Sequence, residues 1–368
     1  MPTAFRIARV RGVELRIDPS WAVIFALLTW ALATSFASIH ATWSLGLTLV
    51  VGALAALSFF ASVLVHELAH TVMARAWGIP VHDITLHLFG GLSSIERDPP
   101  TPKAELWIAI VGPIASVCVG LLALGAAALL LSTNTFTSDA PLDIVRNMGP
   151  TTSVLFWLAG ANFLVAAFNM LPGLPLDGGR VLRAAIWSAT GDLQRATRAA
   201  AIAGQVVGWL LVATGLFMAM GGSVPVLGTG LMGGLWMALI GWVVRGAAVQ
   251  SFRGALLEDM LAGVRTVDLM RAEPPWVPAA LPVGELVDRM LMRDEGRAFP
   301  VYDGTTLVGL VSWTDVKRVA PDERHQTTVQ DIMTPSNRLV TTTGAEPIID
   351  ALKKLRRADV AQLPVLSP

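Results

Sequence analysis

Long uncharged apolar runs, separated by short polar segments, fill the first 250 residues of the chain. The first run extends over residues 19–65 without an Asp, Glu, Lys or Arg. A membrane-spanning helix needs about 20 apolar residues, so this run is long enough for two. Residues 106–132 and 147–176 supply one span each, and residues 199–244 supply two, broken near 221–225. The pattern therefore predicts six transmembrane helices.

Two other segments show the alternation typical of strands. Apolar and charged side chains alternate over residues 10–17, which predicts a short strand pair or an interfacial arm. Residues 81–95 alternate around Gly90 and Gly91, which predicts a hairpin at the membrane surface or dipping into it. The polar segment 38–42 marks the turn between the first two helices, and His40 within it is expected to be solvated.

Composition supports a polytopic membrane protein in contact with the lipid bilayer. The chain is 54% hydrophobic and 15% charged, whereas a soluble domain usually has about 25% charged residues. The net charge is zero and no long segment is basic, which argues against a nucleic-acid partner. Cys118 is the single cysteine, so an internal disulfide and a cysteine-based zinc site are both excluded.

Basic residues in the short loops predict the orientation in the membrane, because such residues are enriched on the cytoplasmic side. With six spans, Arg146 is the single basic residue expected on one side. The other side collects Arg6, Arg9, Arg11, Arg16, Arg75, Arg97, Lys103, Arg180, Arg183, Arg195, Arg198, Arg245 and Arg253. That second side is predicted to be cytoplasmic and to hold both chain termini.

From about residue 253 the chain becomes soluble in character and contains an internal repeat. Residues 266–270 (TVDLM) recur as residues 328–333 (TVQDIM), and the Pro-Val of residues 299–301 recurs at 363–365. The spacing of roughly 60 residues is that of one supersecondary unit per repeat. The first copy continues into a Gly-Leu-Val-Ser-Trp-Thr-Asp stretch, and the second is expected to be incomplete.

The predicted domains follow from these boundaries. Residues 1–250 form a six-helix membrane domain, residues 251–322 a first repeat, and residues 323–368 a second, shorter repeat.

The sequence His66-Glu67-Leu68-Ala69-His70 ends the second apolar stretch. On a helix, two histidines four residues apart point the same way and can bind one Zn²⁺, and the glutamate between them can act as a general base on the attacking water. A carboxylate in apolar surroundings costs about 2.5–3.5 kcal/mol on insertion scales, so something must offset the cost of Glu67. A metal site is the natural candidate; the plainer alternative is a buried, hydrogen-bonded histidine.

Catalytic zinc requires a third protein ligand, and a carboxylate is needed because no further histidine lies in a helical apolar context. Asp177 is the sole acidic residue between Asp143 and Asp192, and it follows an uncharged span. The prolines and glycines around it predict an unwound backbone that can aim the carboxylate back toward His66 and His70. The alternative is a solvated Asp177 at the membrane surface.

These motifs resemble the site-2 proteases, which are intramembrane zinc metalloproteases. The resemblance rests on His66-Glu67-x-x-His70, on Asn169-x-x-Pro-x-x-Pro-Leu-Asp177-Gly two helices later, and on Gly112-Pro113, and it covers roughly residues 5–245. It is closest to the bacterial branch with C-terminal CBS domains. The fold class implied is a polytopic α-helical membrane protein with six transmembrane helices and an α+β CBS-type cytoplasmic domain.

The resemblance also implies roles for individual residues. His66, His70 and Asp177 would bind one Zn²⁺ per chain, and Glu67 would take a proton from water and pass it to the leaving amine. Asn169 would hold the substrate or its oxyanion, the alternative being a helix-packing amide. The 81–95 hairpin would add a strand to an unwound, membrane-anchored protein substrate, as expected in regulated intramembrane proteolysis.

In the CBS-like part, Ser312 and Asp315 match positions that commonly contact an adenosine ribose in that family, which makes an adenine nucleotide a candidate ligand. The alternative is a module for homodimerisation or docking.

Two other functions compete with a protease. One is a CBS-regulated ion transporter or channel, but that function would spread ionisable groups over several helices, whereas here they gather at one place. The other is an inactive scaffold, which the intact His-Glu-x-x-His motif disfavours.

Overall fold

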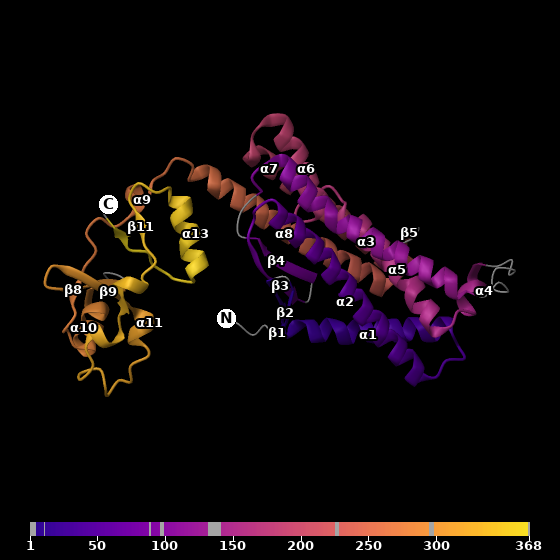
Figure 1. Cartoon of the computed structure of the whole chain (residues 1–368), viewed down its shortest axis with the longest axis horizontal. Helices are drawn as coiled ribbons and strands as arrows, with labels where there is room; N and C mark the ends of the chain where they lie inside the picture. Colours follow the sequence, from indigo (N-terminus) through magenta and orange to yellow (C-terminus); the bar gives the residue numbers. More distant parts are fainter. Residues whose placement is uncertain are drawn as a thin grey trace. The chain divides into compact units, whose positions relative to one another are not determined.

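A computed structural model describes residues 5–10, 12–87, 90–95, 99–131, 141–224, 228–293 and 298–366 (Figure 1). The chain divides into two compact units, Met1–Ala255 and Leu256–Pro368. The first unit holds the His-Glu-x-x-His motif and the second holds the sequence repeat. The predicted domain boundaries at residues 250 and 322 stay predictions.

Six helices in the described residues are long and apolar enough to cross a membrane, which confirms the predicted number. They are α1 (Ser20–Ile39), α2 (Leu45–Ala76), α3 (Pro102–Leu130), α5 (Pro150–Asn169), α7 (Leu193–Ala219) and α8 (Leu231–Met260). Two shorter helices are α4 (Pro141–Arg146) and α6 (Asp177–Thr190). Side chains cap the first turns of three long helices, since Ser44, Thr101 and Asp192 each accept a hydrogen bond from a backbone N–H three residues on.

A four-stranded sheet packs against α2 at the motif. Its order is β1 (Phe5–Val10), β2 (Val13–Ile17), β3 (Val81–His87) and β4 (Gly90–Ile95), with β2 and β3 parallel and the other pairs antiparallel. The strand pair and the hairpin were both predicted; the parallel pairing that joins them was not. Buried Val13, Leu15 and Ile84 of the sheet contact Leu64 and Leu68, which flank His66 and Glu67 in the sequence. Residues 88–89 of the hairpin lie outside the described part of the chain.

The prediction that His40 is solvated was wrong. Only 3% of His40 is exposed, and its ring stacks on Trp43 with the centroids 3.9 Å apart. Its Nδ1 lies 3.1 Å from the carbonyl oxygen of Arg146, and its Nε2 lies 3.1 Å from Ser153 Oγ. The turn is therefore covered by the segment that enters α5, and both ring nitrogens find partners there.

The second unit contains two sheets and several short helices. One sheet has the order β10 (Thr334–Pro335), β9 (Thr306–Ser312), β8 (Ala298–Asp303), β7 (Val277–Pro278), and the other pairs β11 (Thr342–Thr343) with β12 (Val365–Leu366). The helices are α9 (Thr266–Leu269), α10 (Val283–Arg293), α11 (Trp313–Val316), α12 (Val329–Ile332) and α13 (Ile348–Ala358). A buried core of Val277, Leu286, Phe299, Val301 and Val311 joins the first sheet to its helices.

The sequence repeat is also a structural repeat, although its register differs by one residue from the match of Thr266 to Thr328. An aspartate three residues after the N-cap accepts a backbone hydrogen bond at 2.9 Å in both copies, from Arg265 to Asp268 and from Thr328 to Asp331. Arg265 therefore corresponds to Thr328. The short helices α9 and α12 each bind the backbone of the other copy, through Thr266 N to Glu346 O and Val329 N to Leu281 O, both at 2.9 Å.

Candidate metal centre

Helix α2 presents His66 and His70 on one face, one turn apart. Both are 5% exposed, and their Nε2 atoms lie 3.1 Å from each other. Most residues of this helix are apolar. Because the two histidines are four residues apart, their rings lie next to each other, as the motif predicts.

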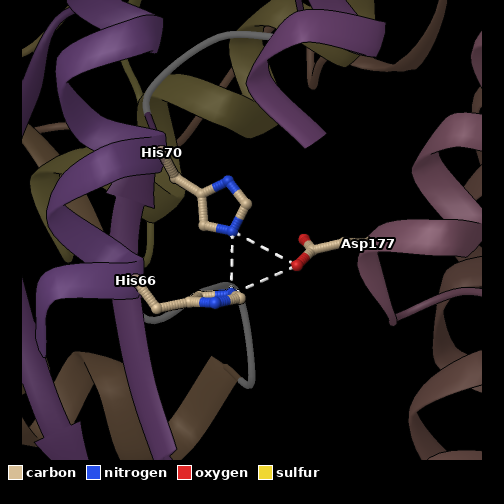
Figure 2. Close-up of side chains that lie close together, drawn as sticks. All are labelled: His66, His70 and Asp177. Atoms are coloured by element: carbon tan, nitrogen blue, oxygen red, sulfur yellow. Dashed lines mark hydrogen bonds and ion pairs between the residues drawn. The ribbon is translucent and has the colours of Figure 1, made fainter. Parts of the chain in front are cut away.

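Asp177 meets this pair from the first turn of α6 (Figure 2). Its Oδ2 atom lies 3.2 Å from the Nε2 atom of His66 and 3.2 Å from that of His70. The ligand atoms of the three buried side chains all lie within 4.8 Å of one another. The structure therefore brings His66 into contact with Asp177, which lies 111 positions later in the sequence.

Close backbone packing places Asp177. The segment between α5 and α6 is held to α7 by a hydrogen bond from Leu174 N to Ala200 O at 3.0 Å. A side chain on Gly178 or Gly179 would overlap the backbone of that same segment, and one on Gly204 of α7 would overlap the carbonyl of Leu174. Glycine is required at these positions because the backbones approach too closely for a Cβ atom. The unwound stretch predicted from its prolines and glycines thus directs the aspartate inward.

The histidines are held on their other side by α3. Ser116 Oγ lies 2.9 Å from His66 Nδ1, and the carbonyl oxygen of Ile108 lies 2.5 Å from His70 Nδ1. Since a carbonyl can only accept, Nδ1 of His70 donates and its Nε2 keeps a lone pair directed at Asp177 and His66. Partners of this kind are typical of metal-binding histidines, whose second nitrogen fixes the ring orientation. The sequence motifs gave no sign of Ser116 or of the Ile108 carbonyl.

Gly112 leaves the space in which the two imidazole rings meet. A Cβ atom built there would overlap His70 Nε2 and would lie 2.8 Å from His66 Nε2. This glycine belongs to the Gly112-Pro113 pair on which the family resemblance partly rests. Its position explains why a residue without a side chain is needed there.

Glu67 follows His66 on the same turn of α2 and is half-buried. Asn169 is the last residue of α5 and lines a largely apolar cavity of about 1040 Å³, formed by residues of α1, α2, α5, α7 and α8. The structure therefore places Glu67 on the turn of α2 that carries His66, and Asn169 at the wall of this cavity.

A buried ion pair beside the centre escaped the sequence interpretation. Glu105 of α3 is fully buried and accepts a hydrogen bond at 2.6 Å from Nε of Arg183 in α6, whose Nη2 also forms an ion pair with the same carboxylate oxygen. Arg180 Nε lies 3.9 Å from the same carboxylate oxygen. The sequence shows only that an acidic residue, Glu105, lies at the start of an apolar span. This pattern does not predict which basic residue pairs with it.

In the second unit, Ser312 and Asp315 contact one another. Asp315 Oδ2 accepts hydrogen bonds from Ser312 N at 2.9 Å and from Ser312 Oγ at 2.6 Å, which caps α11.

The donor set at His66, His70 and Asp177 suits zinc. Two imidazole nitrogens and one carboxylate oxygen leave a fourth position open, as catalytic zinc sites do. Donors bound tetrahedrally at about 2.0–2.1 Å lie roughly 3.3 Å apart, close to the 3.1 and 3.2 Å separations found here. The residues present therefore fit the ion without rearrangement of the backbone.

Comparison with known proteins agrees with this chemistry. Residues 54–214 match peptidase family M50, and residues 264–322 match the CBS domain. The zinc metalloprotease Rip3 of Mycobacterium tuberculosis is 36% identical over 96% of this chain and 86% of its own length. The zinc metalloprotease sll0528 of Synechocystis is 30% identical over 100% of this chain and 92% of its own length. The site-2 protease from Methanocaldococcus jannaschii aligns over 68% of this chain and 95% of its own, with 23% identity and a TM-score of 0.42.

The first two relatives are named as zinc metalloproteases, and they align with nearly the whole chain. This similarity favours a protease over a transporter. The chain belongs to peptidase family M50, the site-2 proteases, and is a multi-pass membrane zinc metalloprotease with a C-terminal CBS domain.

Proposed function

We propose that this enzyme hydrolyses a peptide bond in or near the transmembrane segment of a membrane-anchored protein, with His66, His70 and Asp177 as the ligands of one zinc ion. The observation that carries the proposal is the convergence of three buried donor atoms inside a bundle of membrane-spanning helices. A membrane-anchored substrate would already lie beside a site formed by such helices.

Zinc, when bound, supplies a Lewis acid that polarises the scissile carbonyl and makes water more acidic. Glu67 accepts the proton of the attacking water on its carboxylate and later delivers it to the leaving amide nitrogen. Ser116 and the Ile108 carbonyl hold the two imidazoles in the orientation that keeps their Nε2 lone pairs free for the ion.

The substrate must expose its backbone before hydrolysis. Strand β4 ends the order of the described sheet, so an unwound substrate segment can pair with it. Asn169, at the cavity wall, holds the substrate or the oxyanion that forms on its carbonyl. The apolar cavity beside it accommodates the part of the substrate that remains in the membrane.

The CBS part is proposed to regulate this hydrolysis from the cytoplasmic side, where both termini lie. In this view residues 1–250 are the protease domain, residues 251–322 and 323–368 are the two CBS repeats, and the repeats pair with those of a second copy.

Zinc content and cleavage test the proposed function together. Purified full-length enzyme in liposomes with a single-span candidate substrate is expected to contain about one zinc per chain by mass spectrometry of the metal. Stripping the ion with a chelator is expected to abolish cleavage, and zinc is expected to restore it, because the remaining groups lack a Lewis acid. Cleavage that persists in metal-free enzyme would contradict the proposal.

Adenine nucleotide is the first ligand to test at the CBS part. Isothermal titration of the full chain with ATP is expected to give saturable heat, and Asp315→Ala is expected to remove it, since this change also deletes the cap that orders Ser312. The exposed Asp268→Ala, which deletes an equivalent cap in α9, is the matched control. No heat at millimolar ATP would leave dimerisation or docking as the role.

A further inference from the structure

One face of α3 contacts both histidines of the candidate metal centre and also helix α6, which carries Asp177. Glu105, Ile108, Gly112 and Ser116 are spaced by three or four residues, so they lie along one stripe of the helix. All four are buried. Ile108 and Ser116 hold the two histidine rings, and Gly112 gives those rings space.

The fourth member of the stripe, Glu105, contacts α6 instead of α2. Its Oε1 atom accepts a hydrogen bond from Arg183 Nε and lies 3.9 Å from Arg180 Nε. Along α6, Arg180 follows Asp177 by three residues and Arg183 follows Arg180 by three, so Arg180 neighbours both the candidate ligand and Arg183 on the helix surface. The ion pair between Glu105 and Arg183 therefore fixes the rotation of α6 about its own axis and its position along α3.

Two contacts place α6, and they act at different points. The glycine-dependent packing around Gly178 and Gly179 fixes where the helix begins. Arg183 of the ion pair lies six residues after Asp177, about 9 Å along the helix axis, and fixes the direction in which the helix continues. A helix held at two points along its axis cannot rotate about its own first turn, where Asp177 lies.

We propose that Glu105 is a positioning residue of the zinc centre. Through Arg183, with Arg180 beside it, Glu105 holds Asp177 against the two histidines that the same helix α3 already orients. The proposal rests on the zinc-ligand roles proposed above and adds a residue that touches neither the ion nor the substrate.

A purely stabilising role accounts less well for this ion pair. Burying a carboxylate and a guanidinium gives little net stability, and apolar side chains of similar size usually serve as well or better. The second carboxylate oxygen of Glu105, Oε2, is buried and has no hydrogen-bond partner among the described residues, so the pair is not arranged for greatest stability. An ion pair adds a preferred direction to apolar packing, because the planar guanidinium donates its hydrogen bonds to a carboxylate in few geometries.

Zinc affinity of the purified full-length protein tests the proposal, measured by competition with a chelating dye. Glu105→Gln keeps the shape of the side chain and removes its charge, and Arg183→Ala removes the partner. Each is expected to weaken zinc binding by about 10–100-fold, the range found when residues that orient metal ligands are replaced. Because the two residues act as one link, the double variant is expected to bind zinc no more weakly than the worse single variant.

The matched control is Arg195→Ala, which breaks the exposed ion pair of Arg195 with Asp192 at the start of α7. Its zinc affinity is expected to equal that of the native chain. Cobalt substitution gives a second readout, because the visible spectrum of Co²⁺ reports ligand geometry. The spectrum is expected to change in Glu105→Gln and to stay native in Arg195→Ala.

The outcomes separate this proposal from the proposed function. If the native chain binds zinc and His66→Ala removes it, while Glu105→Gln keeps native affinity and a native cobalt spectrum, the positioning role is wrong and the ligand roles stand. A lower melting temperature with unchanged affinity and spectrum would equally overturn it. If His66→Ala binds zinc as the native chain does, the ligand roles themselves fail.

If Arg183→Ala does not fold, Arg183→Lys replaces it. Lysine keeps the positive charge but lacks the planar guanidinium group, so this variant is also expected to weaken zinc binding.

Discussion

Replacing Glu67 by glutamine is expected to lower the rate of peptide hydrolysis by about 10²–10⁴-fold, the usual contribution of general acid–base catalysis. Glutamine has the same shape as glutamate but cannot take a proton from water. The three ligand atoms belong to other side chains, so zinc content is expected to stay near one per chain. The measurement pairs single-turnover cleavage in liposomes with metal analysis of the same preparation.

The control for this change is Glu258→Gln, which alters a half-exposed glutamate paired with Lys353 near the end of α8 and is expected to leave the rate unchanged. Native activity in Glu67→Gln would remove the base role from Glu67. Loss of both activity and zinc would instead show that Glu67 supports the metal site and would leave its catalytic role without evidence.

Adding one methyl group at Gly112 is expected to disable the centre without touching a ligand. In Gly112→Ala the new Cβ would overlap one imidazole and crowd the other, so at least one ring has to leave its position. Overpacking of a filled site costs about 1–3 kcal/mol, which corresponds to a loss of zinc affinity of up to roughly 100-fold if the strain falls on the bound state. Hydrolysis is expected to fall with zinc occupancy, and excess zinc is expected to restore only part of it.

The same substitution further along α3 provides the control. Gly125 has open space around its Cα, so Gly125→Ala adds the same methyl group to the same helix without a clash. Zinc affinity and activity are expected to stay native there. If Gly112→Ala also binds zinc with native affinity, the rings have room that the structure does not show, and the packing argument fails.

The six helices of the membrane domain were predictable because a segment that crosses the lipid bilayer must be apolar. Each span must be apolar for about 20 residues, so the six helices follow from where charges stop and resume. The metal centre was predictable in outline for a related reason. His66, Glu67, His70 and Asp177 are ionisable groups next to apolar spans, where such residues rarely occur without a role.

Contacts between distant segments were less predictable. The pairing of β2 with β3 joins residues 13–17 to residues 81–87, and alternation within each strand does not specify a partner. The salt bridge of Glu105 to Arg183 likewise depends on how two helices lie against each other. His40 was misjudged because a polar residue in a turn is usually hydrated, whereas here a later segment covers it.

The repeat in the second unit shows a subtler limit. Matching Thr266 to Thr328 by letter placed the two copies one residue out of step, because the capping role falls on Arg265 in one copy and on Thr328 in the other. Position in the local hydrogen-bond pattern, rather than residue identity, defines the correspondence.

Val13 and Leu15 of β2 and Ile84 of β3 pack against Leu64 and Leu68, so the sheet supports the turn of α2 that carries His66 and Glu67. A peptide strand that pairs with β4 at the edge of this sheet would be joined, through the sheet, to the helix that carries His66 and Glu67. A displacement of the sheet against the membrane would then carry the bound strand and Glu67 together, which would preserve the orientation of the scissile bond toward the proposed base.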